Sequence, residues 1–207
     1  MASSLGTNKS YIGGWLFVGA TAITVLSAAL VIERLHQWSD RAANHELQLS
    51  RLQTETNRLD ALEWKAIAQQ KVDSDLQEAL EAHRDRSEVI LAELKITAAS
   101  PEDLEEVYSS YDSYVKAVNQ LLELLKAGEI SEALEVDEEK VDPGYENLYE
   151  TIAEESVEAV ATSKIARNYA FRGSMLTSLA LITIISSVFY RYRQANQKIQ
   201  LALFEQE

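Results

Sequence analysis

The chain has 207 residues, of which 46% are hydrophobic and 25% are charged, and its formal net charge is −14. It has no cysteine, which excludes disulfide bonds, thiolate metal sites and a thiol nucleophile. Residues 33–172 hold 15 of the 19 basic and 31 of the 33 acidic residues, and this net charge of −16 disfavours binding to nucleic acid. Only 7 glycines and 2 prolines are present, so the composition predicts an all-α fold of long helices with few loops.

Two uncharged apolar runs predict two transmembrane helices. The first, Tyr11–Ile32, has about 22 residues, and the second, 173–190, has about 18, near the roughly 20 residues that a bilayer core requires. The alternative for the first run is a cleaved signal peptide, since Ser27-Ala28-Ala29 is an acceptable cleavage site. Because the apolar run continues past that site, we expect it to be retained as a span.

Basic residues set the expected topology. Lys9 precedes the first span, and Arg191 and Arg193 follow the second, so the positive-inside rule places both termini in the cytoplasm. The expected location is a plasma membrane. The resulting order is a cytoplasmic N-terminus (1–10), transmembrane helix 1 (11–32), an extracytoplasmic domain (33–172), transmembrane helix 2 (173–190) and a cytoplasmic juxtamembrane helix (191–207).

Apolar residues at three- and four-residue spacing predict four helices within the extracytoplasmic domain. The expected limits are 33 to about Lys71, about Asp75 to Ile96, Pro101 to about Ala127, and Ser131 to the second span with a restart or kink at Pro143. Asp73 or Ser74 can cap the second helix, and Ser100 can cap the third. Gly128 is the expected end signal of the third helix.

These helix lengths fit an up-down four-helix bundle on a two-helix stalk. The middle two helices have about 25 residues each, whereas the outer two, counted from the membrane, are longer by about 15. The additional residues, Glu33–Leu47 and roughly 157–172, form the expected stalk. A stalk of two helices leaves much of its apolar stripe in water, and we therefore expect a homodimer that buries it.

Two stretches have sequences typical of one class of receptors. They are 59–68 (LDALEWKAIA) in the first helix and 124–133 (LLKAGEISEA) between the third and fourth helices. Together with the order of spans and bundle over about 11–190, they resemble the four-helix-bundle sensor (input) module of methyl-accepting chemotaxis receptors, sensor histidine kinases and diguanylate cyclases. The chain departs from those receptors after the second span, where a HAMP linker usually carries a proline and 191–207 has none.

Seven residues are candidates for a ligand site in the bundle: Trp64, Arg84, Arg86, Tyr108, Tyr111, Tyr114 and Lys116. The three tyrosines step along one side of the third helix and either line a small-molecule pocket or pack in the core with their hydroxyls at its rim. The basic residues either pair with a ligand carboxylate or form salt bridges within the bundle. Trp64 either stacks on a ligand or packs between helices.

No cofactor, metal ion or catalytic residue is expected. His45 and His83 lie on helix seams at different heights, which favours a packed or pH-responsive core role over metal ligation. An acidic group can hold a divalent cation through oxygen ligands, but its spacing is not that of an EF-hand, and a solvated face is preferred. The members of this group are Glu132, Glu135, Asp137, Glu138, Glu139 and Asp142. The sequence lacks a nucleophile–base pair and a phosphate loop, so the chain itself is not expected to be an enzyme.

The expected function is a transmembrane signal-input module. Binding of an unknown small ligand or periplasmic protein shifts the fourth helix against the first by about 1–2 Å, and the junction with the second span passes this shift to a cytoplasmic output. No proline or glycine interrupts 145–172 upstream of that span. An output enzyme such as a histidine kinase or diguanylate cyclase is expected beyond residue 207 or on a partner. The alternative is a membrane-anchored coiled-coil adaptor or docking protein that senses nothing.

Overall fold

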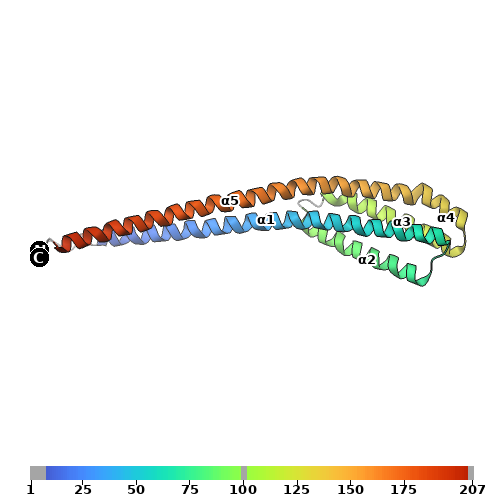
Figure 1. The fold of residues 1–207 in the computed structure, drawn as a ribbon, viewed down its shortest axis with the longest axis horizontal. Helices are drawn as coiled ribbons and strands as arrows, with labels where there is room; N and C mark the ends of the chain where they lie inside the picture. Colours follow the sequence, from blue (N-terminus) through green and yellow to red (C-terminus); the bar gives the residue numbers. More distant parts are fainter. Residues whose placement is uncertain (1–7, 99–101, 205–207) are drawn as a thin grey trace. The chain divides into compact units, whose positions relative to one another are not determined.

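The computed structural model describes residues 8–98 and 102–204, and their regular structure is entirely helical (Figure 1). In chain order the α-helices are α1 (Asn8–Gln69), α2 (Ser74–Thr97), α3 (Glu105–Ala127), α4 (Ile130–Val136) and α5 (Asp142–Phe204). A 3₁₀ turn, η1 (Glu102–Leu104), precedes α3, and a π-helical turn, η2 (Asp137–Val141), joins α4 to α5. These described residues contain no strand, so the predicted all-α class is confirmed.

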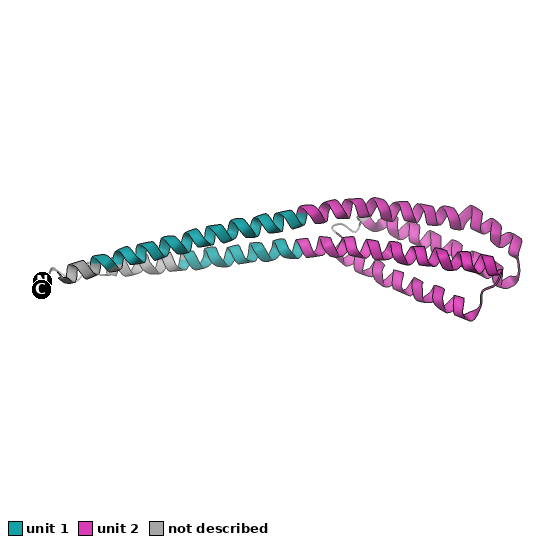
Figure 2. Cartoon of the chain, viewed as in Figure 1, with its two compact units in different colours: residues 1–38, 166–207 teal, residues 39–165 magenta. Residues whose placement is uncertain are grey.

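The helices divide into two compact units (Figure 2). The bundle unit comprises residues 39–165, and the terminal unit comprises 1–38 together with 166–207. The helices α1, with 62 residues, and α5, with 63 residues, contribute to both units. Each unit is described separately below.

Local sequence signals account for the helix ends. The carboxylate of Asp73 accepts a hydrogen bond from the backbone N–H of Leu76 at 2.8 Å, so Asp73, of the two candidates, caps α2. Gly128 follows α3 with a φ of 79°, a left-handed conformation that glycine adopts without a steric penalty, as predicted. Ser100, the predicted cap of the third helix, lies outside the described residues.

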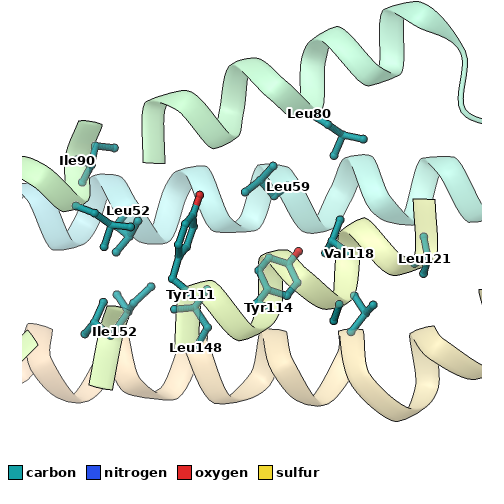
Figure 3. Packing of buried hydrophobic residues seen from close by; sticks show 14 of the residues in the cluster. Leu52, Leu59, Leu80, Ile90, Tyr111, Tyr114, Val118, Leu121, Leu148 and Ile152 are labelled. Atoms are coloured by element: carbon teal, nitrogen blue, oxygen red, sulfur yellow. The ribbon is translucent and has the colours of Figure 1, made fainter. Parts of the chain in front are cut away.

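The bundle unit is held together by a core of apolar side chains from its long helices (Figure 3). The labelled members are Leu52 and Leu59 of α1, Leu80 and Ile90 of α2, Tyr111, Tyr114, Val118 and Leu121 of α3, and Leu148 and Ile152 of α5. Full burial of one leucine or isoleucine side chain contributes about 1.5–3 kcal/mol, so the apolar faces dominate the stability of this unit. The helical periodicity of the sequence predicted that each long helix has an apolar face, and Leu121 was not among the residues expected there.

The helix widens at η2, which ends two residues before Pro143. Proline has no N–H group, and its ring collides with the carbonyl four residues earlier, so it disrupts a regular α-helix. In η2 the N–H of Asp142 donates to the carbonyl of Asp137, five residues earlier, which makes this turn π-helical. The predicted restart is therefore present, because α5 begins at Asp142 with Pro143 in its first turn.

The terminal unit contains an apolar segment that is exposed to its surroundings. The helical stretch Ile130–Ala195 includes an 18-residue window that is apolar enough to cross a membrane and contains no buried residue. It is the one such stretch among the described residues. Two spans were predicted. The first, Tyr11–Ile32, is helical, but the side chains of 11–18 and 20 lie outside the described set, so a second crossing remains a prediction.

Within the terminal unit, α1 and α5 approach closely at Gly173. A Cβ atom added at this position would lie 2.5 Å from Cδ1 of Leu35. Nearby, the rings of Trp38 and Tyr169 have centroids 6.2 Å apart and planes tilted by 43°, a favourable aromatic arrangement. The missing side chain at Gly173 therefore permits the close helix contact.

Candidate functional site

A groove of about 500 Å³ lies between α1 and α2 in the bundle unit. Charged residues of both signs line it: Arg51, Glu55 and Arg58 from α1, and Asp85, Arg86 and Glu93 from α2. Thr54 also lines the groove, and Val89 and Ile90 supply its apolar surface. A concave surface with apolar walls and a few convergent charges is the usual form of a small-ligand site.

Glu55 is the centre of an ion-pair network on this groove. Its side chain is 9% exposed, and its Oε1 accepts a hydrogen bond from Nη1 of Arg58 at 2.8 Å. Its Oε2 accepts from Nε of Arg86 at 3.0 Å, and Nδ1 of His83 lies 2.6 Å from the same oxygen and 2.7 Å from Nη2 of Arg86. Each helix supplies residues three apart, which lie on one helical face. The network therefore fastens α1 to α2 beside the groove.

The hydrogen bonds of Glu55 also fix its charge. Burial alone would raise the pKa of the Glu55 carboxyl, but the hydrogen bonds from His83 and Arg86, and the positive charge of those groups, outweigh burial and hold the pKa below its ordinary value. Glu55 is therefore an anion at neutral pH. The side chains of Arg58 and Arg86 are 55% and 49% exposed, so their remaining N–H groups are accessible from solvent.

Arg51 adds a further cation to the groove. It lies one helical turn before Glu55 on α1 and forms no ion pair with any of the described residues. A guanidinium group offers five donors in a planar fork that matches a carboxylate or phosphate. Together with Arg58 and Arg86, it gives the groove the means to bind a small anion by charge-assisted hydrogen bonds.

The basic residues predicted from the sequence have different environments. Arg86 lines the groove, as described. Arg84 donates instead to Oδ1 of Asn119 at 2.6 Å, and Lys116 pairs with Asp112 on the exposed surface of α3. Lys116 thus forms the salt bridge that the second alternative predicted, whereas the partner of Arg84 is a neutral amide.

The predicted aromatic residues do not line the groove. Tyr111 and Tyr114 are buried, Tyr108 is half-buried, and Trp64 is 50% exposed rather than packed between helices. The Tyr108 hydroxyl donates to the carbonyl of Leu91 at 2.5 Å. The Tyr114 hydroxyl is buried and has no partner among the described residues. The prediction that this hydroxyl lies at the rim of the core is therefore wrong.

Sequence reasoning missed Arg51, Glu55 and Arg58. The spacing of Glu55 and Arg58 indicates an ion pair along one helix face. The spacing does not show which residues of a neighbouring helix lie beside Glu55. Because many acidic residues of the bundle are spaced similarly, the partnership of Glu55 with His83 required the tertiary structure.

A second histidine makes a separate polar contact in the bundle unit. Nδ1 of His45 lies 3.1 Å from Oγ1 of Thr97, and its Nε2 lies 3.2 Å from Oε1 of Glu155. His45 is 8% exposed, so it links three helices from within the bundle. His83 thus contacts Glu55 whereas His45 contacts Glu155, so the two histidines do not share a site.

The acidic group near α4 contains both exposed and buried residues. Glu132, Glu135, Glu138, Glu139 and Asp142 are exposed. Asp137 is 6% exposed, so the prediction that the whole acidic group lies on a solvated face is wrong for this residue. It belongs to the π-helical turn η2, whose extra residue per turn changes the helical register, and it contacts α1.

Comparison with known proteins assigns no family. No family model matches the chain, and neither a curated protein nor a solved structure matches it. The function must therefore be inferred from the groove and the helices themselves.

Proposed function

We propose that the chain is a membrane-anchored signal-input module whose bundle unit binds an extracytoplasmic ligand in the groove between α1 and α2. The observation that carries this proposal is α5, a single helix of 63 residues. It includes the buried core residues Leu148 and Ile152 and also the apolar segment 173–190. A change in the bundle that displaces α5 is therefore passed along one helix toward the membrane.

The proposed topology has two membrane crossings, 11–32 and 173–190, with residues 33–172 in the periplasm of a bacterium. It is supported by the basic residues that flank the two runs on their outer sides. The module acts as a homodimer in the inner membrane. It carries no enzymatic activity, and a cytoplasmic output such as a histidine kinase or diguanylate cyclase performs the chemistry.

The proposed ligand is a small molecule with a carboxylate or another anionic group. Arg51 and Arg86 lie on the two helices that form the groove, so one anion can bridge them. Such a bridge competes for the guanidinium of Arg86, which is bonded to Glu55 in the unliganded protein. The expected response is a shift of about 1–2 Å between α1 and α5.

The experiment measures that shift in the full chain in membranes. The chain has no cysteine, so a pair introduced as Leu35→Cys with Gly173→Cys reports on the α1–α5 contact alone. Carboxylates and inorganic phosphate are first screened for those that raise the Tm of the protein. We expect the anions that do so to change the rate at which the cysteine pair forms a disulfide. Arg51→Gln with Arg86→Gln abolishes the response, and Leu35→Cys with the exposed Phe171→Cys is the control pair. An unchanged rate with every stabilising anion contradicts signal input.

A second candidate, docking without sensing, is favoured by exposed apolar residues on α5. Val157 is 73% exposed and Ile165 is 51% exposed, and a shallow groove of about 450 Å³ adjoins Val157. Such a face is available to another helix or to a second copy of the chain. Docking predicts association that Val157→Asp disrupts, with no response of the cysteine pair to small anions.

A further inference from the structure

Two acidic side chains meet inside the bundle unit, away from the α1–α2 groove. Glu63 of α1 is fully buried, with 0% exposure, and Asp137 of η2 is 6% exposed. Asp137 is the C-cap residue of α4 through its backbone N–H, but neither side chain caps a helix end and neither belongs to the Glu55 network. Burial of an ionised carboxylate is strongly unfavourable unless hydrogen-bond donors or positive charges compensate.

No such compensation surrounds Glu63. Among the described residues, no N–H or hydroxyl group donates to either of its carboxylate oxygens, and Oδ1 of Asp137 also lacks a donor. The group in hydrogen-bonding position to Glu63 is the carboxyl group of Asp137. Two ionised carboxylates have no hydrogen to share, so this contact requires that one of them carries a proton.

The surroundings oppose ionisation further. The charged groups that act on Glu63 are Asp137 of η2, Asp60 of α1 and Asp142 of α5, and all three are acidic. From α3, the buried Tyr114 hydroxyl interacts with Asp60 and Glu63 and has no hydrogen-bond partner among the described residues. Lys140, the basic residue of η2, is exposed and donates to Gln120 instead.

We propose that Glu63 and Asp137 form a proton-binding site that holds the π-helical turn η2 against α1 and releases it when the proton is lost. The proton bridges the two carboxyl groups, so that the pair carries one negative charge rather than two. Loss of the proton leaves two adjacent anions in a dry site, and hydration requires η2 to separate from α1. The proposal is independent of ligand binding in the groove.

The position of η2 makes it suited to such a release. A π-helical turn has poorer hydrogen-bond geometry than an α-helix and often occurs at functional places in helices. Pro143 lies two residues after the end of η2, and it removes one backbone donor from the first turn of α5. Separation at η2 therefore acts on the start of α5.

The same site gives a pH dependence of known sign. Burial, the contact with Asp137 and the neighbouring acidic groups raise the pKa of Glu63 from 4.5 to about 9. The folded chain then binds more protons than the unfolded chain between these values, so stability falls as the pH rises through that window. For one proton, the folding equilibrium constant decreases by up to about tenfold per pH unit.

The test is the unfolding of the full chain in detergent, measured from pH 5 to pH 9.5 in EDTA, for four proteins. Wild type is compared with Glu63→Gln, Asp137→Asn and a control, Glu139→Gln, which changes an exposed carboxylate in the same region. We expect the wild type and the control to lose stability as the pH rises. The two site variants should retain their stability over the same range. Their folding equilibrium constant should lack the decrease of up to about tenfold per pH unit that is expected for the wild type. Parallel profiles for all four proteins overturn the proposal.

Infrared spectroscopy supplies a second readout that does not depend on how well a variant folds. The wild-type protein should show the C=O band of a protonated, buried carboxyl group at pH 7, and this band should disappear as the pH rises. Its absence at pH 7 overturns the proposal. A calcium or magnesium ion that restores wild-type but not Glu63→Gln stability at high pH also overturns it, because the site then holds a cation instead of a proton.

Discussion

Substitution of Glu55 by glutamine tests whether its network fastens α1 to α2. Glutamine keeps the size of the side chain but removes the negative charge that His83, Arg58 and Arg86 share. The hydrogen bond to the largely buried His83 is worth about 1.5–3 kcal/mol, since its acceptor is an ionised carboxylate. The two half-exposed arginine pairs add about 0.2–1 kcal/mol each. Glutamine can still accept one of these hydrogen bonds, so we expect a net loss of about 2 kcal/mol at pH 7.

Thermal unfolding of the full chain in detergent measures this loss. For a protein of about 200 residues, 2 kcal/mol corresponds to a decrease in Tm of roughly 4–8 °C. The control is Glu78→Gln on the exposed surface of α2, which should leave Tm nearly unchanged. The measurement is repeated as a function of pH, because the charge on Glu55 is the quantity under test.

The pH dependence distinguishes a charge effect from a packing effect. The pKa of Glu55 is lower in the folded chain than its ordinary value of 4.5. Its contribution to stability is therefore complete above about pH 4.5 and is lost as the pH falls through the folded-state pKa. The difference between wild type and Glu55→Gln should disappear at low pH. A Tm difference that is absent at pH 7, or that persists unchanged in acid, refutes this account of the network.

Three further substitutions test local features of the bundle unit by denaturant or thermal unfolding. Gly128→Ala should destabilise the protein by about 1 kcal/mol, because alanine is strained at a φ of 79°; no change in stability contradicts the left-handed end of α3. Asp73→Ala should cost about 1 kcal/mol through loss of the hydrogen bond to Leu76, whereas Asp73→Asn should restore most of it. Tyr114→Phe removes a buried hydroxyl without a described partner and should be neutral or stabilising, whereas Tyr114→Ala should cost about 3–5 kcal/mol. A large loss with Tyr114→Phe indicates a hydrogen bond to that hydroxyl.

The helices and their inward faces were predictable because they depend on neighbours in the sequence. Helical periodicity identified the apolar face of α3, and Asp73, Gly128 and Pro143 act within one turn of their own positions. Composition likewise predicted the apolar helix at 173–190, since length and hydropathy alone decide whether a segment can cross a membrane. These features require no information about which helices are adjacent.

The polar sites were decided by the tertiary structure. Glu55 and Glu63 are both acidic residues of α1, yet one meets His83 and two arginines while the other meets Asp137. Their partners depend on the rotation and relative height of the neighbouring helices, and for Asp137 on the register change in the π-helical turn. A sequence fixes which residues can ionise or donate. Packing determines which of them are brought together and whether water remains between them, and hence whether a carboxyl group is an anion or holds a proton.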